Sequence, residues 1–262
     1  MTAFEHAVSV GTDMLEIDCQ RTADGHVVVA HDDDLRRLTG HDARISETRL
    51  SDLPPIRRQL PVEFMSFKHT EGDDCRIPLL REVFERFRNL PMNIDIKVED
   101  ERLIRDVSQL VREFQREHIT VWGNAKHTTI QKCHRENPNI PILFSFRRVV
   151  IITFSFYIGL LPFLPMKEQF LEIFLPSIFL KKDKEFFAMN KKWRLLLWFV
   201  DKLMVRRAIF EHLDRRGVHT YLWVLNDEAD WLRAERLNVT GVMTDFPSKY
   251  TQFLSSNGFG QK

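Results

Sequence analysis

Two carboxylates and a histidine recur at strand-like spacing in the stretch Met14–Leu35, which reads MLEIDCQRTADGHVVVAHDDDL. Glu16 and Asp18 alternate with apolar residues, which is the two-residue period of a strand with two faces. A second run contains three valines, and the Asp-Gly pair between the runs is a strong signal for a hairpin turn. A two-residue loop there would place Asp18 directly across from His31, with Cβ atoms roughly 5 Å apart. The spacing therefore predicts that two carboxylates and an imidazole meet on one face.

Such a pair of carboxylates points to a cation. Two nearby carboxylates repel each other unless a positive charge lies between them. A hard divalent metal ion, bound through oxygen, is the partner that this chemistry favours. The alternative is that Glu16 and Asp18 are only the solvated face of a half-exposed strand.

Later motifs, in the same order, connect this hairpin to a known family. Asn93–Lys97 reads NIDIK, Trp223–Asn226 reads WVLN, and Gly241–Pro247 reads GVMTDFP. Together with L-E-I-D, the Asp-Gly turn, V-V-V-A-H-D and L-x-x-x-T-G, these motifs make the chain similar to the glycerophosphodiester phosphodiesterases. The sequence most resembles the membrane-associated branch of the family, which acts as a lysophospholipase D.

The resemblance implies which residues carry the chemistry. Glu16 and Asp18 match the family's metal-binding Glu-x-Asp pair, and Asp95 stands where the family usually has a metal-ligand Glu. Three carboxylates suit Mg²⁺ or Ca²⁺ better than zinc. His31 matches one of two histidines that share the proton transfers, and Lys97 would neutralise a phosphate oxygen. A salt bridge from Lys97 to Glu16 or Asp95 is the alternative role for the lysine.

Two further residues have two possible roles each, and a third has one. Trp223 either walls the glycerol end of the site or fills the interior of a barrel. Asp32 either orients the ring of His31 or caps the following turn. Asn226 lies at the end of an expected strand, where barrel active sites are built, and we expect it to bind substrate.

The elements that must position these residues alternate between strand and helix. Alternation of this kind is the signature of a parallel sheet or barrel. We expect helices over 2–10, from Pro78 onward, over 103–114 and through 130–133, and strands at 94–97, 119–122, 142–146, 218–225 and 242–244. Residues 36–77 are polar and contain several prolines, so an irregular excursion over the barrel mouth is expected there.

The resemblance implies a TIM-like (β/α)8 barrel, but one lacking its first strand. In the family, that strand ends in His-Arg and leads to a Glu-Asn-Thr segment, and neither motif is present here. If Met1 is the true start, we expect a nearly inactive chain, because one acid/base residue alone contributes about 10² to 10⁴ in rate. The alternative function is that of a truncated isoform or fragment that binds lipid or a partner protein. A barrel of another hydrolase family is a third, weaker reading.

A hydrophobic insert interrupts the alternation. Val149–Met166 contains no charged residue, and as a helix it would be about 27 Å long, slightly short of the ~30 Å hydrocarbon core. Leu195–Val200 is a second apolar region, flanked by tryptophans and basic residues as at a membrane interface. A buried core helix is the alternative. We expect one barrel domain over 1–262, in which 149–200 is an interfacial or re-entrant insert that associates with membrane.

The net charge and the cysteine content of the chain limit which binding partners and which cellular compartment are expected. The 262 residues carry 38 Lys and Arg against 37 Asp and Glu, so no net charge attracts nucleic acid. Three dispersed cysteines favour a reducing compartment. We therefore expect a metal-dependent hydrolase of lysophospholipids or glycerophosphodiesters, releasing head-group alcohol and lysophosphatidic acid. Its expected location is cytoplasmic, on intracellular membranes such as the endoplasmic reticulum or perinuclear membranes.

Overall fold

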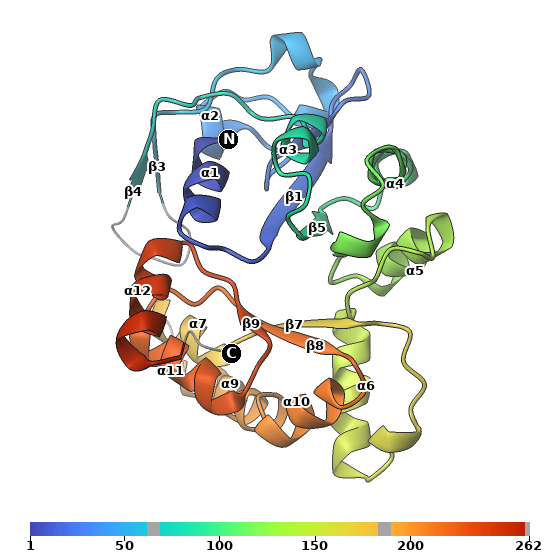
Figure 1. The fold of residues 1–262 in the computed structure, drawn as a ribbon, viewed down its shortest axis with the longest axis vertical. Helices are drawn as coiled ribbons and strands as arrows, with labels where there is room; N and C mark the ends of the chain where they lie inside the picture. Colours follow the sequence, from blue (N-terminus) through green and yellow to red (C-terminus); the bar gives the residue numbers. More distant parts are fainter. Residues whose placement is uncertain (62–68, 183–189, 260–262) are drawn as a thin grey trace. The chain divides into compact units, whose positions relative to one another are not determined.

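The computed structural model describes residues 1–61, 69–182 and 190–259 of the chain. The chain forms two compact units (Figure 1). The first takes residues 1–61 and 69–145, and the second takes the described chain from residue 146 onward. Each unit has its own sheet.

The first unit contains a four-stranded sheet in the order β2-β1-β5-β6. β1 pairs parallel to β5 and β5 parallel to β6, whereas β2 is antiparallel to β1. Its strands are β1 (Leu15–Arg21), β2 (Val27–Val29), β5 (Met92–Ile96) and β6 (Thr120–Gly123). Its longer helices are α1 (Thr2–Ser9), α3 (Leu80–Arg86), α4 (Glu101–Glu113) and α5 (His127–Glu136), and η3 (Glu117–Ile119) precedes β6. These elements confirm the predicted alternation within a few residues.

Helix α4 shows why the pattern was readable from the sequence. Leu103, Ile104, Val107 and Val111 recur at helical spacing, and all four are buried. The Asp100 side chain accepts a hydrogen bond from the backbone N–H of Arg102 and so caps the start of the helix.

The β1–β2 hairpin corrects the predicted register by one residue. Cys19 lies opposite Val29, and the N–H of Ala30 donates to the carbonyl of Asp18, so Asp18 faces Ala30 and not His31. The reason is a loop one residue longer than predicted, closed by hydrogen bonds between Thr22 and His26. A loop of three residues needs one left-handed residue, and Gly25 supplies it with φ +92°.

Residues 36–61 and 69–77 contain more regular structure than predicted. They include α2 (Arg36–Thr39), the short 3₁₀ helices η1 (Ile45–Glu47) and η2 (Leu50–Asp52), and the two-stranded sheet β3 (Gln59–Pro61) with β4 (His69–Glu71). A small apolar core lies beneath this segment, formed by Val28, Ala30, Leu35, Ile45 and Ile77. These apolar residues are too widely spaced in the sequence to produce a periodic signal.

The second unit contains a parallel sheet in the order β7-β8-β9. Its strands are β7 (Phe170–Phe174), β8 (His219–Trp223) and β9 (Gly241–Val242). Its helices are α6 (Phe146–Tyr157), η4 (Leu161–Phe163), α7 (Pro176–Lys182), α9 (Lys191–Met204), α10 (Arg207–Asp214), α11 (Glu228–Leu237) and α12 (Pro247–Asn257). Strand β7 was not predicted; it lies within the hydrophobic 149–200 segment. The strand predicted at 142–146 is reduced to one bridge between Trp122 and Ile142, and Phe146 already begins α6.

Candidate active site

The parallel register of β1 and β5 brings two of the predicted carboxylates together. Asp18 lies opposite Asp95, and Glu16 lies opposite Asn93. Neighbouring strands are about 4.8 Å apart, and residues two apart share a face of a sheet. Glu16 therefore lies on the face of Asp18, one pleat earlier. This confirms that Asp95 lies at the same end of the sheet as Glu16 and Asp18.

Lys97, directly after β5, lies between the two aspartates. Its Nζ is 2.8 Å from Oδ1 of Asp18 and 2.7 Å from Oδ2 of Asp95, and all three side chains are at least three-quarters buried. Burial acts to lower the pKa of Lys97, but the charges and hydrogen bonds of Asp95 and Asp18 outweigh it and hold that pKa above its ordinary value. The salt bridge weighed for Lys97 is therefore present, with Asp18 as an additional partner.

Asn124 was not recognised in the sequence as part of this cluster. It directly follows β6, and its amide donates to Oδ1 of Asp95 at 3.1 Å and to the carbonyl of Ile96 at 2.8 Å. Asn124 therefore orients Asp95 while Lys97 binds the other carboxylate oxygen. The only signal in the sequence is a polar residue after a buried strand, the position where a parallel sheet gathers its site residues.

The donor atoms of the cluster are of the kind that a hard cation prefers. Asp18 and Asp95 already hold one positive charge between them, and Mg²⁺ and Ca²⁺ prefer carboxylate oxygens. Burial raises the pKa of the Cys19 thiol, and the charges of Asp18, Asp95 and Glu16 raise it further. Among the described residues, however, no three His, Cys, Asp or Glu side chains are gathered closely enough to hold a metal ion.

His31 follows β2 and is held by a neighbouring carboxylate. Its Nδ1 lies 2.6 Å from Oδ1 of Asp32, and Oδ2 of Asp32 accepts a hydrogen bond from Nε of Arg37 at 2.5 Å. Of the two roles weighed for Asp32, this geometry supports orientation of the ring. Burial acts to raise the pKa of Asp32, but the hydrogen bonds from Arg37 and His31 outweigh it and hold that pKa below its ordinary value. Because Asp32 occupies Nδ1, the opposite nitrogen, Nε2, can face a substrate.

Trp223 and Asn226 belong to the second unit. Trp223 ends β8, is half-buried, and packs its ring against Phe174 with centroids 5.8 Å apart. The amide of Asn226 donates to Oδ2 of Asp245 at 2.7 Å, and its carbonyl oxygen accepts from the hydroxyl of Thr244 and the N–H of Asp245. This network fixes the segments that follow β8 and β9, and the sequence had not singled out Asp245.

Residues 1–249 match the model of the glycerophosphoryl diester phosphodiesterase family. The chain belongs to this family. It is 52% identical to human lysophospholipase D GDPD1 over 254 residues, which cover 97% of this chain and 81% of the relative. It is 36% identical to human lysophospholipase D GDPD3, covering 98% of this chain and 81% of that protein. These similarities confirm the resemblance seen in the motifs.

Solved structures of the family share the fold. The glycerophosphoryl diester phosphodiesterase domain of a Mycobacterium tuberculosis protein aligns with a TM-score of 0.71 at 14% identity, covering 96% of this chain and 92% of that one. An Oleispira antarctica phosphodiesterase, solved with the product sn-glycerol-3-phosphate, aligns with a TM-score of 0.64 at 16% identity, covering 97% and 90%. The family fold is the α/β barrel that was expected. The absence of a first strand stays a prediction.

Proposed function

We propose that this chain hydrolyses lysophospholipids or related glycerophosphodiesters as a lysophospholipase D, releasing the head-group alcohol and lysophosphatidic acid. The observation that supports this most is the in-register pair of Asp18 and Asp95 around Lys97, on neighbouring parallel strands of a family phosphodiesterase. The name lysophospholipase D, carried by a relative that is 52% identical, supports the substrate class.

The roles of the residues follow from their chemistry. We propose that Glu16, Asp18 and Asp95 hold Mg²⁺ or Ca²⁺. Such an ion, when bound, would withdraw charge from the phosphodiester. His31, oriented by Asp32, would move a proton to or from the reacting oxygens through Nε2. Lys97 would neutralise a phosphate oxygen.

The family resemblance assigns substrate binding to Trp223 and Asn226 of the second unit, and we keep this assignment as a proposal. Trp223 offers a half-buried aromatic face for the glycerol portion. Asn226 offers amide groups at the end of β8, although its described hydrogen bonds to Asp245 and Thr244 would have to be shared with the substrate.

The test is hydrolysis of lysophosphatidylcholine or lysophosphatidylethanolamine with added Mg²⁺ or Ca²⁺, following lysophosphatidic acid by mass spectrometry. Asp18→Asn and His31→Ala should each lower turnover, the latter by about 10² to 10⁴. Asp214→Asn, which changes an exposed carboxylate on α10, is the matched control. Turnover that needs neither Asp18 nor a divalent ion would contradict the assignment.

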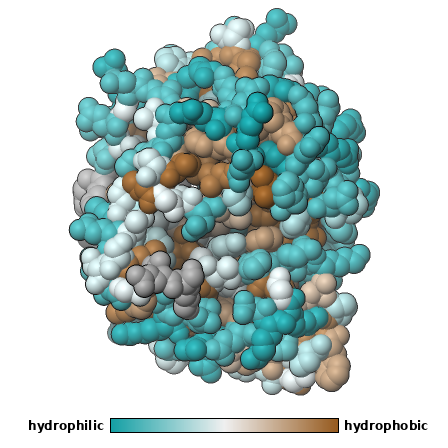
Figure 2. Space-filling view, viewed as in Figure 1, coloured by the Kyte–Doolittle hydropathy of each residue, from teal (hydrophilic) through white to brown (hydrophobic). Residues whose placement is uncertain are grey.

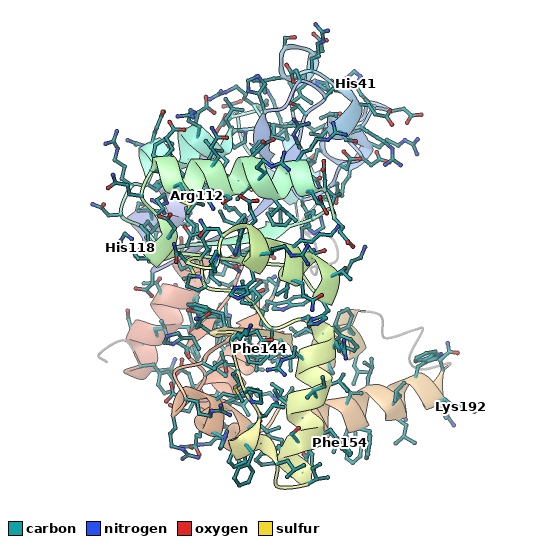
Figure 3. The ribbon with its side chains drawn as sticks, turned by 90° about the vertical axis from the view of Figure 1, so that its right-hand side faces the viewer. His41, Arg112, His118, Phe144, Phe154 and Lys192 are labelled. Atoms are coloured by element: carbon teal, nitrogen blue, oxygen red, sulfur yellow. The ribbon has the colours of Figure 1, made fainter. Side chains whose placement is uncertain are left out.

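Two helices of the second unit expose an unusual number of large apolar side chains. In α6 and η4 they include Phe146, Phe154 and Phe163, which are 59%, 64% and 79% exposed. In α9 they are Trp193, Leu195, Leu196, Trp198 and Phe199, each about half exposed or more. The Tyr157 hydroxyl donates to the carbonyl of Leu203 at 3.0 Å, so the C-terminal ends of α6 and α9 lie side by side. We call these exposed residues the α6/α9 surface; Figure 3 labels Phe154 on it, and apolar atoms are visible over α6 in Figure 2.

The charges beside the α6/α9 surface are of one sign. The two helices carry exposed Arg147, Lys191, Lys192, Arg194 and Lys202 (Lys192 is labelled in Figure 3). Their one acidic residue, Asp201, is buried and paired with Arg233 at 2.7 Å. No helix in the described ranges is long and apolar enough to cross a membrane. We propose that this surface lies in the interface of an anionic membrane, on the endoplasmic reticulum or perinuclear membranes.

Vesicle flotation tests the membrane proposal. The wild-type chain should bind phosphatidylcholine vesicles more strongly when phosphatidylserine is added. Trp193→Ala with Trp198→Ala should weaken binding to both, whereas Lys191→Glu with Lys192→Glu should weaken binding only to anionic vesicles, by about tenfold or more. Arg102→Glu with Arg105→Glu, two exposed residues of α4, is the charge-matched control. A wild-type chain that stays unbound would overturn the proposal, and binding without turnover would favour the alternative lipid-binding role.

A further inference from the structure

The cation between Asp18 and Asp95 is supplied by the chain itself. Lys97 places its ammonium 2.8 Å from one carboxylate and 2.7 Å from the other. The strand register fixes the two aspartates side by side, and Asn124 holds the second oxygen of Asp95. The carboxylates are thus oriented toward a single positive charge before any ligand binds.

We propose that Lys97 is a built-in competitor for the divalent ion, and that metal loading converts it from a counter-ion into a phosphate-binding group. This inference rests on the proposed function, because it takes the metal to bind Asp18 and Asp95. The aspartates belong to paired strands, whereas the ammonium lies at the end of a flexible four-carbon stem. Since a dication and an ammonium repel each other at short range, the side chain that moves is the lysine.

The exchange couples the two ligands of the site. An ammonium released from Asp18 and Asp95 is available to a phosphate oxygen. A phosphate that binds this ammonium keeps it away from the carboxylates and thereby favours the metal. Thermodynamic linkage makes the effect reciprocal: metal strengthens phosphate binding as much as phosphate strengthens metal binding.

Calorimetric titration of the full chain with Ca²⁺ or Mg²⁺ alone tests this directly. Lys97→Met should bind the ion more tightly than the wild type by about tenfold or more, in the range of ordinary coupling between ligands. Lys132→Met is the matched control, because Lys132 also bridges two acids, Glu99 at 3.2 Å and Glu101 at 3.1 Å, outside the site. The control should bind the ion as the wild type does.

A second measurement needs no variant, in case Lys97→Met does not fold. Labelling of the wild type with an amine-specific reagent, read by mass spectrometry, should modify Lys97 faster when the ion is present, with Lys132 unchanged. Equal metal affinity in wild type and Lys97→Met, or labelling of Lys97 that does not respond to the ion, would overturn the competition while leaving the metal site intact. No metal binding by either protein would overturn the metal site and this inference together.

Discussion

His31 is the residue whose orientation depends most on its neighbours. Asp32 binds Nδ1 of its ring, and Arg37 binds the other oxygen of Asp32. The side chain of His31 is 45% exposed, so packing alone does not fix the ring. The two hydrogen bonds therefore supply the order that a proton-transferring group needs before substrate arrives.

Replacing Asp32 by Asn should lower kcat/KM for lysophosphatidylcholine by roughly 10- to 100-fold, the usual cost of losing a group that orients a site residue. The amide keeps the shape but removes the charge that holds both His31 and Arg37. Asp34→Asn is the control, since Asp34 is half exposed and binds the backbone of Arg36. Equal losses in both variants would show that the effect is not specific to the His31 contact.

The lowered pKa of Asp32 also predicts a pH dependence of stability. A carboxyl whose pKa falls on folding stabilises the native state fully above its unfolded pKa, about 3.9, and loses that contribution as pH falls through the folded pKa. The melting temperatures of wild type and Asp32→Asn should therefore differ at pH 6 and converge toward pH 3. A difference that grows on acidification would contradict the sign of the shift.

Among the site residues, those that strand geometry constrains were predictable. Asp95 lies near the end of β5 and Asp18 lies opposite it on the parallel strand β1, so their meeting could be predicted from the order and direction of the strands. Asn124 also follows a parallel strand, but it belongs to no motif. A single Asn after a strand has many ordinary roles, so its part in the site could not be predicted. The partners of His31 depend on how the chain turns after β2, which no periodic pattern encodes.

At the scale of elements, the connection into β5 depends on a buried arginine. Arg116 follows α4, is 1% exposed, and donates to the carbonyls of Phe87 at 2.9 Å, Arg88, and Leu90 at 2.5 Å. Its guanidinium also lies over the ring of Phe84. Burial lowers its pKa to about 10, so the charge is costly and is offset by these contacts. The guanidinium ties the end of α3 to the strand that carries Asp95.

Arg116→Met should lower the free energy of unfolding by about 3 kcal/mol, because it leaves several buried carbonyls without a donor. Arg112→Met, on the exposed side of α4, should cost less than about 1 kcal/mol, since it loses only an exposed hydrogen bond to the carbonyl of Glu136 and a surface ion pair with the same residue. Urea unfolding of the two variants measures the difference. Similar midpoints would mean that the carbonyls find other donors.

Elements with a clear period were predicted well, and those without one were not. The buried face of α4 repeats at helical spacing, so its bounds follow within two residues. Strand β7 lies among long apolar runs, where alternation cannot be distinguished from a buried or membrane-facing helix. The predicted register of the hairpin was wrong by one residue, because the same Asp-Gly pair suits loops of two or three residues.

At the scale of the whole molecule, the family match crosses the boundary between the two units. It runs from residue 1 to 249, and the solved family structures cover 96% or more of the chain. The prediction of one barrel domain over 1–262 agrees with that extent and stays a prediction. We expect one cooperative unfolding transition for the chain, with the same urea midpoint for both units.

The division into units also gives the chain two natural spectroscopic and chemical reporters. All three cysteines, Cys19, Cys75 and Cys133, lie in the first unit, and every tryptophan except Trp122 lies in the second. Burial raises the pKa of Cys19 and brings that of Cys133 to about 12, so both thiols stay unreactive until the first unit opens. Trapping of Cys19 and Cys133, counted apart from the partly exposed Cys75, therefore follows the first unit, while indole fluorescence follows mainly the second. Separate midpoints for the two signals would reveal an intermediate in a chain without engineered labels.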